Sequence, residues 1–185
     1  GVMVSENGLF TEMIKNYAEE SEKYGKKRSI WITEFGFTTF SFDGKNEKGL
    51  YAGFTEECQA VYLVRRFILG LAHPDIAVTC QYDLLDDYHS KEYNPEANFG
   101  IIRADHSRKP AFYAVQRMNS LFNGYSFDPD PVVKVLSQPL HRSCKRGVLV
   151  KSWDSVPMQA NNEVLAFAFK NDKSNKMLAV WSAQP

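Results

Sequence analysis

The alternation of helical and strand patterns over residues 1–124 constrains the fold more than any other feature. Apolar residues recur at helical spacing over residues 9–24, 55–72 and 110–123. Between them lie two short runs rich in β-branched residues, 29–33 and 76–82. Two strands joined through a helix lie parallel in one sheet. The order therefore predicts an α/β fold with parallel strands.

Residues that commonly begin or end helices flank these segments. Gly25 follows the last apolar position of the first helix, where helices often stop. Thr55 is a suitable N-terminal cap for the second helix. Pro110 suits the first position of the third, where its missing N–H costs nothing. These signals support the three predicted helices.

The composition changes after residue 124. Residues 125–131 are rich in Pro and Asp and are expected to form a linker. Residues 132–185 are then expected to form all or part of a small β-sandwich domain. Its strands are predicted at 132–136, 147–153, 164–169 and 177–181, the last two forming a hairpin through the turn-rich residues 171–175.

Charge and composition exclude some functions. The chain has 22 basic and 22 acidic residues, so it lacks the basic surplus typical of nucleic-acid binding. The apolar runs are too short to span a bilayer, and the first residues do not form a signal-peptide pattern. No histidine or cysteine spacing indicates a metal site. We therefore expect no nucleic-acid partner, no membrane partner, no metal and no organic cofactor.

Glu34 is the most informative candidate for chemistry. It directly follows the first predicted strand, and Gly36 allows the backbone to turn sharply two residues later. The carboxyl ends of parallel strands carry the active sites of α/β barrels. A carboxylate there can attack an anomeric carbon or act as a general base. The alternative is a solvated residue at the end of a strand.

Residues 30–36 read Ile-Trp-Ile-Thr-Glu-Phe-Gly. This stretch resembles the seventh strand of the clan A (β/α)8-barrel glycoside hydrolases, a group that contains many retaining β-glycosidases. Its pattern is apolar-Trp-apolar-Thr-Glu-aromatic-Gly, and the glutamate is the nucleophile. Further downstream, residues 81–84 resemble the end of the eighth strand, and residues 98–103 and 109–114 resemble the final loop and helix. Xylosidase-, iduronidase- and endoglycanase-like members often carry a C-terminal β-sandwich. The matching residues of the first segment are Trp31, Thr33, Glu34, Phe35 and Gly36.

The resemblance implies that residues 1–124 hold only strands seven and eight of a TIM barrel, because a complete barrel takes about 250 residues. It implies a carbohydrate substrate, and a secreted, periplasmic or lysosomal location. It also implies Glu34 as the catalytic nucleophile. The side chains expected to bind substrate are Trp31, Phe35, Phe37, Tyr82, Asp83 and Tyr88.

Several of these residues have a structural alternative. Phe35 and Phe37 could stack on a sugar or pack in the core. Tyr82 stands where the family usually has a tryptophan beneath the sugar, and it could equally be core packing. Asp83 and Tyr88 belong to a polar loop, which also contains Asp86, Asp87 and His89, and which could bind hydroxyl groups or be a solvated surface.

The fourth strand of the family, which ends in Asn-Glu and supplies the general acid/base, has no counterpart in this sequence. The chain is therefore interpreted as the C-terminal part of a glycosidase, completed by the rest of a longer chain or by a companion polypeptide. A rival interpretation is a non-catalytic carbohydrate-binding or structural protein on a decayed glycosidase scaffold. A third is a self-sufficient two-domain α/β protein.

Overall fold

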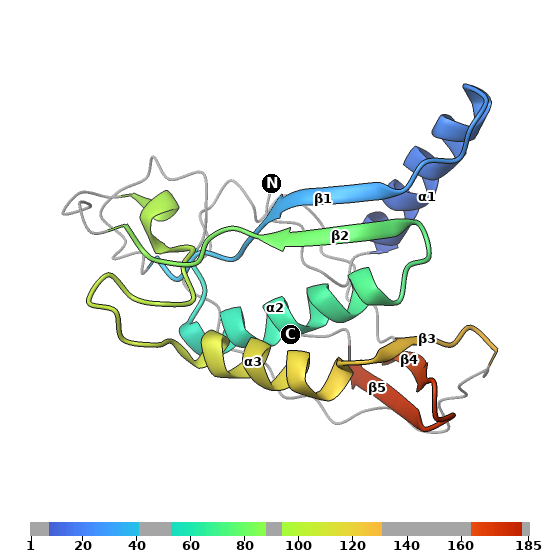
Figure 1. Ribbon diagram of the computed structural model, residues 1–185. Coiled ribbons are helices and arrows are strands. Elements are labelled where there is room, and N and C mark those ends of the chain that lie inside the picture. The colour runs from blue at the N-terminus through green and yellow to red at the C-terminus, as the bar shows by residue number, and fades with distance from the viewer. Residues whose placement is uncertain (1–7, 41–52, 88–93, 131–163, 183–185) are drawn as a thin grey trace.

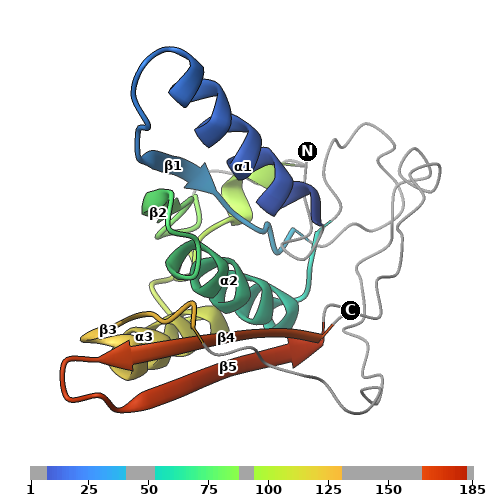
Figure 2. The same ribbon diagram turned by 90° about the vertical axis from the view of Figure 1, so that its right-hand side faces the viewer.

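The computed structural model describes residues 8–40, 53–87, 94–130 and 164–182. A two-stranded parallel sheet lies on one side of two helices, α2 and α3. A three-stranded antiparallel sheet packs near the C-terminal ends of these helices (Figure 1). Seen from the side, α1 and the antiparallel sheet lie on opposite sides of α2 (Figure 2). The predicted strands at 132–136 and 147–153, and Tyr88, lie outside the described residues.

All three predicted helices are present: α1 (Gly8–Lys23), α2 (Glu56–Leu71) and α3 (Pro110–Phe122). The Thr55 hydroxyl caps α2 by accepting a hydrogen bond from the Cys58 N–H, at 3.2 Å. Gly25 adopts a φ of 96° just beyond α1, a conformation that glycine adopts without strain. Within the described part of the chain, no helix is long and apolar enough to cross a membrane.

The parallel sheet consists of β1 (Ile30–Phe35) and β2 (Ile76–Gln81), joined through α2. The predicted parallel pairing is thus confirmed. The helix lies very close to the sheet at Gly70, where an added Cβ would lie 2.6 Å from the Thr79 hydroxyl oxygen. A glycine at this position therefore lets α2 approach β2.

The core lies between the parallel sheet and the helices. Leu63 of α2 is fully buried, and the Phe37 and Tyr62 rings lie 5.4 Å apart within the same cluster. A second cluster joins α1 to the sheet through Phe10 and Ile14. The helices therefore cover one face of the parallel sheet.

The antiparallel sheet has the order β3–β4–β5, with strands Tyr125–Phe127, Val164–Asn171 and Lys176–Ser182. The predicted hairpin of the last two strands is confirmed. The first three residues of the expected linker, 125–127, form β3 and pair with β4 instead of connecting two domains. Phe169 is 1% exposed and packs edge-on against Phe122 of α3, which attaches the sheet to the helical layer.

Candidate active site at the strand ends

Glu34 lies within the last two residues of β1, one residue deeper in the strand than the sequence predicts. Ile32 pairs with Thr79 and Phe35 with Gln81, so β1 contains one more residue than β2 between these pairs. Such a bulge changes which face a side chain occupies. As a result Thr33 and Glu34 are both exposed, whereas Phe35 returns to the side of the helices.

The ends of the two strands are joined at Gly36 and Tyr82. The Tyr82 N–H donates to the Phe35 carbonyl at 2.7 Å. A Cβ on Gly36 would lie 2.0 Å from the Tyr82 carbonyl oxygen, so only glycine fits. The Tyr82–Asp83 peptide bond is cis. This joint fixes the backbone beyond Glu34 against the backbone that carries Tyr82.

Tyr82 is partly exposed beside several carboxylates. Its ring is 37% exposed and lies edge-on to Phe99, with centroids 5.6 Å apart. Partial desolvation raises the pKa of the Tyr82 hydroxyl above its ordinary value, and nearby negative charges raise it further. The phenol is therefore a neutral hydrogen-bond donor at neutral pH. The contributing carboxylates belong to Asp83, Glu96, Glu34 and Asp87.

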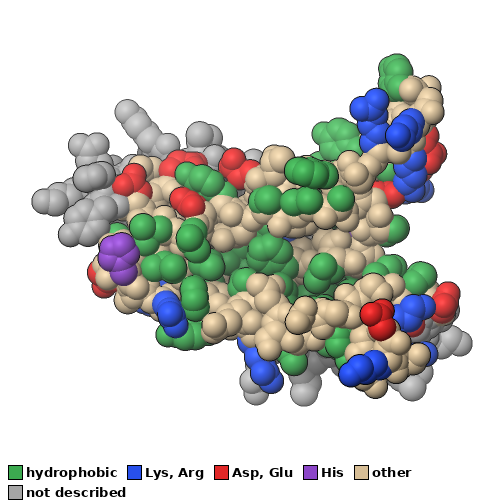
Figure 3. All heavy atoms as spheres, viewed as in Figure 1, with side chains coloured by type: hydrophobic (Ala, Val, Ile, Leu, Met, Phe, Trp, Pro, Cys, Tyr) green, Lys and Arg blue, Asp and Glu red, His purple; other side chains and the backbone are tan. Residues whose placement is uncertain are grey.

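The open face of the parallel sheet carries Trp31, which is 65% exposed. Ala77 and Cys80 of β2 are exposed as well. In Figure 3 apolar side chains lie in the open across the middle of the molecule, and carboxylates gather toward the carboxyl ends of the strands. The described chain thus presents an aromatic ring and a carboxylate, Glu34, along one uncovered strand.

Phe35 and Phe37 pack in the core, which is the structural alternative to stacking on a sugar that the sequence left open. Phe37 is 2% exposed, and its ring packs edge-on against Phe54 at 5.7 Å. Phe35 packs edge-on against Phe67 of α2 at 5.2 Å. Both rings therefore lie on the helical side, beneath the strand that carries Glu34.

A buried ion pair lies at the same end of the molecule. The Lys109 ammonium is 2.8 Å from both carboxylate oxygens of Asp86, and the two side chains are 1% and 10% exposed. Sequence reasoning missed this pair, because it placed Asp86 in a polar loop that either binds hydroxyl groups or is a solvated surface. Burial raises the pKa of Asp86 and lowers that of Lys109, while the attraction between them opposes both shifts.

Two glutamine side chains brace the loop before α3 against the strand ends. The fully buried Gln59 amide of α2 donates to the carbonyls of Phe37, Phe99 and Gly100, at 2.8, 3.2 and 3.1 Å. Gln81 of β2 donates to the same Phe99 carbonyl at 3.0 Å. A polar residue that interrupts an apolar helical stripe, as Gln59 does, is the signal that could have found this brace.

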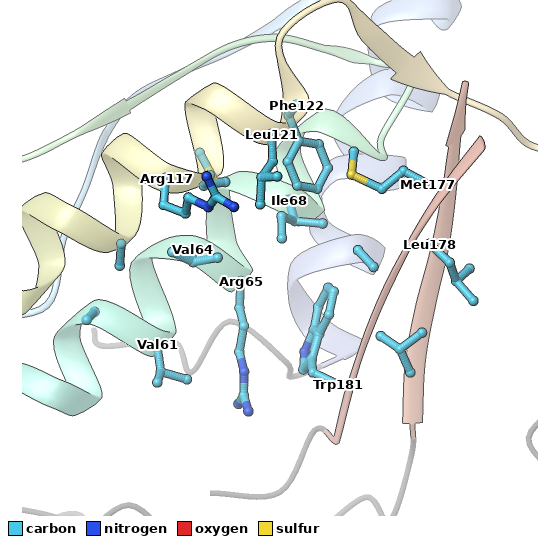
Figure 4. Close-up of a pocket in the computed structure, with 15 residues that line it drawn as sticks. Val61, Val64, Arg65, Ile68, Arg117, Leu121, Phe122, Met177, Leu178 and Trp181 are labelled. Carbon is cyan, nitrogen blue, oxygen red and sulfur yellow. The ribbon is translucent and has the colours of Figure 1, made fainter. Parts of the chain in front are cut away.

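The described residues contain no group of three or more His, Cys, Asp or Glu side chains able to hold a metal ion. A separate groove of about 550 Å³ lies between α2, α3 and β5 (Figure 4). Apolar side chains such as Val64 and Leu121 form most of its walls, with Trp181 at one side and Arg65 and Arg117 at its rim. It contains no carboxylate, unlike the strand ends.

No family model and no curated protein matches the sequence. Among solved structures, the chain is similar to a family 39 glycoside hydrolase from the gut symbiont Bacteroides cellulosilyticus WH2, with 22% identity and a TM-score of 0.58. The match covers 91% of this chain but 27% of that one, so this chain spans about a quarter of its length. The similarity shows that the α/β arrangement is a glycosidase-like fold.

Weaker matches are β-glucuronidases. Those of Lactobacillus rhamnosus and Ruminococcus gnavus have TM-scores of 0.41 and 0.40, with 28% and 18% identity. The matches cover 63% and 58% of this chain, and 19% and 18% of those proteins.

Proposed function

We propose that this chain is the C-terminal part of a clan A retaining glycoside hydrolase and that Glu34 is its nucleophile. In this proposal β1 and β2 are the seventh and eighth strands of a (β/α)8 barrel. The observation that carries the proposal is the bulge between Ile32 and Phe35, which turns Glu34 onto the open face at the carboxyl end of a parallel strand. Carboxylates at this position perform the chemistry of α/β barrels.

The proposed reaction is a double displacement. Glu34 attacks the anomeric carbon, and the bond to the leaving oxygen breaks as a carboxylic acid elsewhere in the barrel protonates that oxygen. Water then attacks the anomeric carbon of the glycosyl ester, whose bond to the Glu34 oxygen breaks and releases the carboxylate. The same acid, now a carboxylate, accepts the water proton. The two carboxyl groups should lie about 5–5.5 Å apart in the complete site.

Trp31, Tyr82 and Asp83 are the proposed substrate contacts from this chain. Trp31 and Tyr82 each offer an exposed aromatic surface near Glu34, and aromatic rings stack well on the apolar faces of sugars. The neutral Tyr82 hydroxyl can donate a hydrogen bond to a sugar oxygen. Phe35 and Phe37 are proposed to act from beneath, by packing under the strand that bears Glu34.

The remaining barrel strands are the proposed partner of this chain. Among the described residues, each strand of the parallel sheet has one neighbour, and the face that carries Trp31 is open. Each Å² of apolar surface left in water forfeits about 25 cal/mol, and unpaired strand edges promote aggregation. The other strands, from a longer chain or a companion polypeptide, would cover this surface and supply the acid.

The test is the hydrolysis of an aryl β-glycoside by the completed protein, which is this chain together with the remaining barrel strands. Glu34→Gln should lower kcat at least about 10³-fold, the scale expected for removal of a catalytic group. Glu12→Gln, an exposed glutamate on α1, is the matched control and should leave kcat unchanged. Equal activity of both variants would refute the role of Glu34. A completed wild-type protein that binds a sugar but never cleaves it would instead favour the non-catalytic alternative.

A further inference from the structure

We propose that Lys109 is a positioning residue of this site, whose buried ammonium fixes the loops that follow β1 and β2 and thereby sets the position of Glu34 relative to Tyr82. This inference rests on the proposed function for its kinetic consequence. Its structural part, the joining of the two loops, can be tested without that function.

The ammonium of Lys109 joins three segments that are distant in sequence. It donates to the Thr39 hydroxyl, in the loop after β1, at 2.8 Å. It pairs with Asp86, in the loop after β2, at 2.8 Å. It also donates to the carbonyl of Asn98, at the end of the 3₁₀ helix 95–98, at 3.4 Å. Lys109 itself immediately precedes α3, so one side chain holds together four parts of the chain.

The ammonium has as many partner residues as it has protons. A lysine has three N–H donors and no acceptor, and Lys109 has three partners. At 1% exposure the side chain has almost no access to water that could replace a lost partner. Asp86 is equally constrained, because a Cβ on Gly100 would lie 2.8 Å from its Oδ1 and 2.3 Å from its backbone nitrogen.

Short connections lead from this cluster to the candidate site. The Thr39 N–H donates to the Asn98 carbonyl at 2.9 Å, which ties the loop after β1 to the segment that continues into Phe99. The Phe99 ring lies against Tyr82. The Asp83 N–H donates to the Phe99 carbonyl at 3.3 Å. Residues 98 and 99 therefore connect the Lys109 cluster to the ends of both strands, because they contact Thr39 after β1 and Tyr82 and Asp83 after β2.

A buried ion pair contributes little net stability compared with apolar groups of the same size, whereas an unpaired buried charge costs several kcal/mol. Lys109→Met alone would leave Asp86 unpaired and could unfold the protein. The double variant Lys109→Met/Asp86→Leu removes both charges and keeps the volume filled. The double variant therefore distinguishes the contribution of the ion pair to stability from its effect on the position of the loops.

In the completed protein, the double variant should lower kcat for an aryl β-glycoside about 10²-fold, because a displacement near 1 Å costs about this much. KM should change less than threefold and the melting temperature should stay close to that of the wild type. Lys26→Met, an exposed lysine, is the control and should change none of these values. A folded double variant with wild-type kcat would overturn the positioning role.

Amide hydrogen exchange supplies a readout that does not depend on catalysis. The Thr39 amide should exchange at least tenfold faster in the double variant, while amides in the middle of α3 keep their protection. Unchanged exchange at Thr39 would overturn the inference even if activity fell. If the wild-type protein shows no turnover, the proposed function fails, and the exchange experiment alone decides whether Lys109 positions the loops.

Discussion

At the scale of single residues, the candidate site depends on contacts that bring backbone very close to backbone. Gly36 illustrates this, because the Tyr82 carbonyl occupies the place of a side chain. The resemblance of residues 30–36 to a known motif predicted that Glu34 and Gly36 matter. It did not predict the bulge, because a one-residue insertion in a strand depends on how β1 and β2 pair.

Gly36→Ala should loosen the joint between the strand ends. The added Cβ would meet the Tyr82 carbonyl, and overpacking of this kind costs about 1–3 kcal/mol. We expect faster amide exchange at Tyr82, whose N–H donates to Phe35. Gly124→Ala is the control for general destabilisation: its Cβ meets nothing within 4 Å, but the φ of 78° strains an alanine there. Because that strain lies away from the joint, exchange at Tyr82 should stay unchanged. Equal exchange in both variants would contradict the tight fit at Gly36.

The buried polar residues were the main failure of residue-scale reasoning. Gln59 and Lys109 belong to types that are usually exposed, and their partners lie 11 to 70 positions away in the sequence. Local pattern cannot reveal such partners. Asp86 was misjudged for the same reason, because its loop is polar in sequence while its carboxylate is buried against a lysine.

At the scale of elements, sequence periodicity was sufficient where an element is set by local signals. The three helices, both parallel strands and the C-terminal hairpin follow from apolar spacing, caps and turn residues. The short strand β3 was missed because its sequence precedes a Pro/Asp-rich stretch and its partner is remote. Ser126, for example, pairs with Lys170.

Thr55→Ala tests the predicted cap of α2. Loss of the hydroxyl leaves the Cys58 N–H without its acceptor, which should lower the free energy of unfolding by about 1 kcal/mol. Thr11→Ala, within α1 and exposed, should be neutral or slightly stabilising because alanine favours helix. Denaturant unfolding of the completed protein measures both. Identical effects of the two substitutions would argue against the cap.

The antiparallel sheet should weaken in acid through Asp128. This carboxylate is 4% exposed and accepts a hydrogen bond from Lys170 at 2.9 Å, which lowers the pKa of Asp128 below 3.8. Because the pKa of Asp128 is lower in the folded protein than in the unfolded chain, the ion pair stabilises the fold at pH values above the unfolded-state pKa. This stabilisation disappears as the pH falls through the folded-state pKa.

The measurement is the protection of the Asp128 amide from hydrogen exchange between pH 2 and 6, corrected for intrinsic exchange. This amide donates to the Ala168 carbonyl of β4. Protection should fall below about pH 3.8 in the wild type. Lys170→Met should show lower protection already at pH 6 and a smaller acid-dependent loss. An unchanged profile in that variant would mean that Lys170 does not set the pKa of Asp128.

At the scale of the whole molecule, length was the decisive sequence argument. Two βα units are too few to close a barrel. The described residues form one two-stranded parallel sheet, with an exposed tryptophan on one face. In the proposed barrel, the acid residue belongs to the fourth strand, whose Asn-Glu pattern has no counterpart in this sequence.

The isolated 185-residue chain should consequently associate. On size-exclusion chromatography it should elute as aggregates or as an assembly well above 21.1 kDa, because no described segment covers the Trp31 face or the outer edges of β1 and β2. It should hydrolyse no glycoside alone, since general acid catalysis contributes about 10²–10⁴-fold and the proposed acid lies on barrel strands outside this chain. A monomer that unfolds cooperatively would favour the self-sufficient two-domain alternative.

The most direct test of the central claim is to trap the glycosyl-enzyme intermediate. A 2-fluoro aryl glycoside with a good leaving group slows both steps, because fluorine destabilises the oxocarbenium-like transition state, and the covalent ester then accumulates. Mass spectrometry of the digested, completed protein should find one sugar attached to the peptide that contains Glu34, and Glu34→Gln should carry none. Attachment to any other carboxylate, with Glu34 unmodified, would contradict the account.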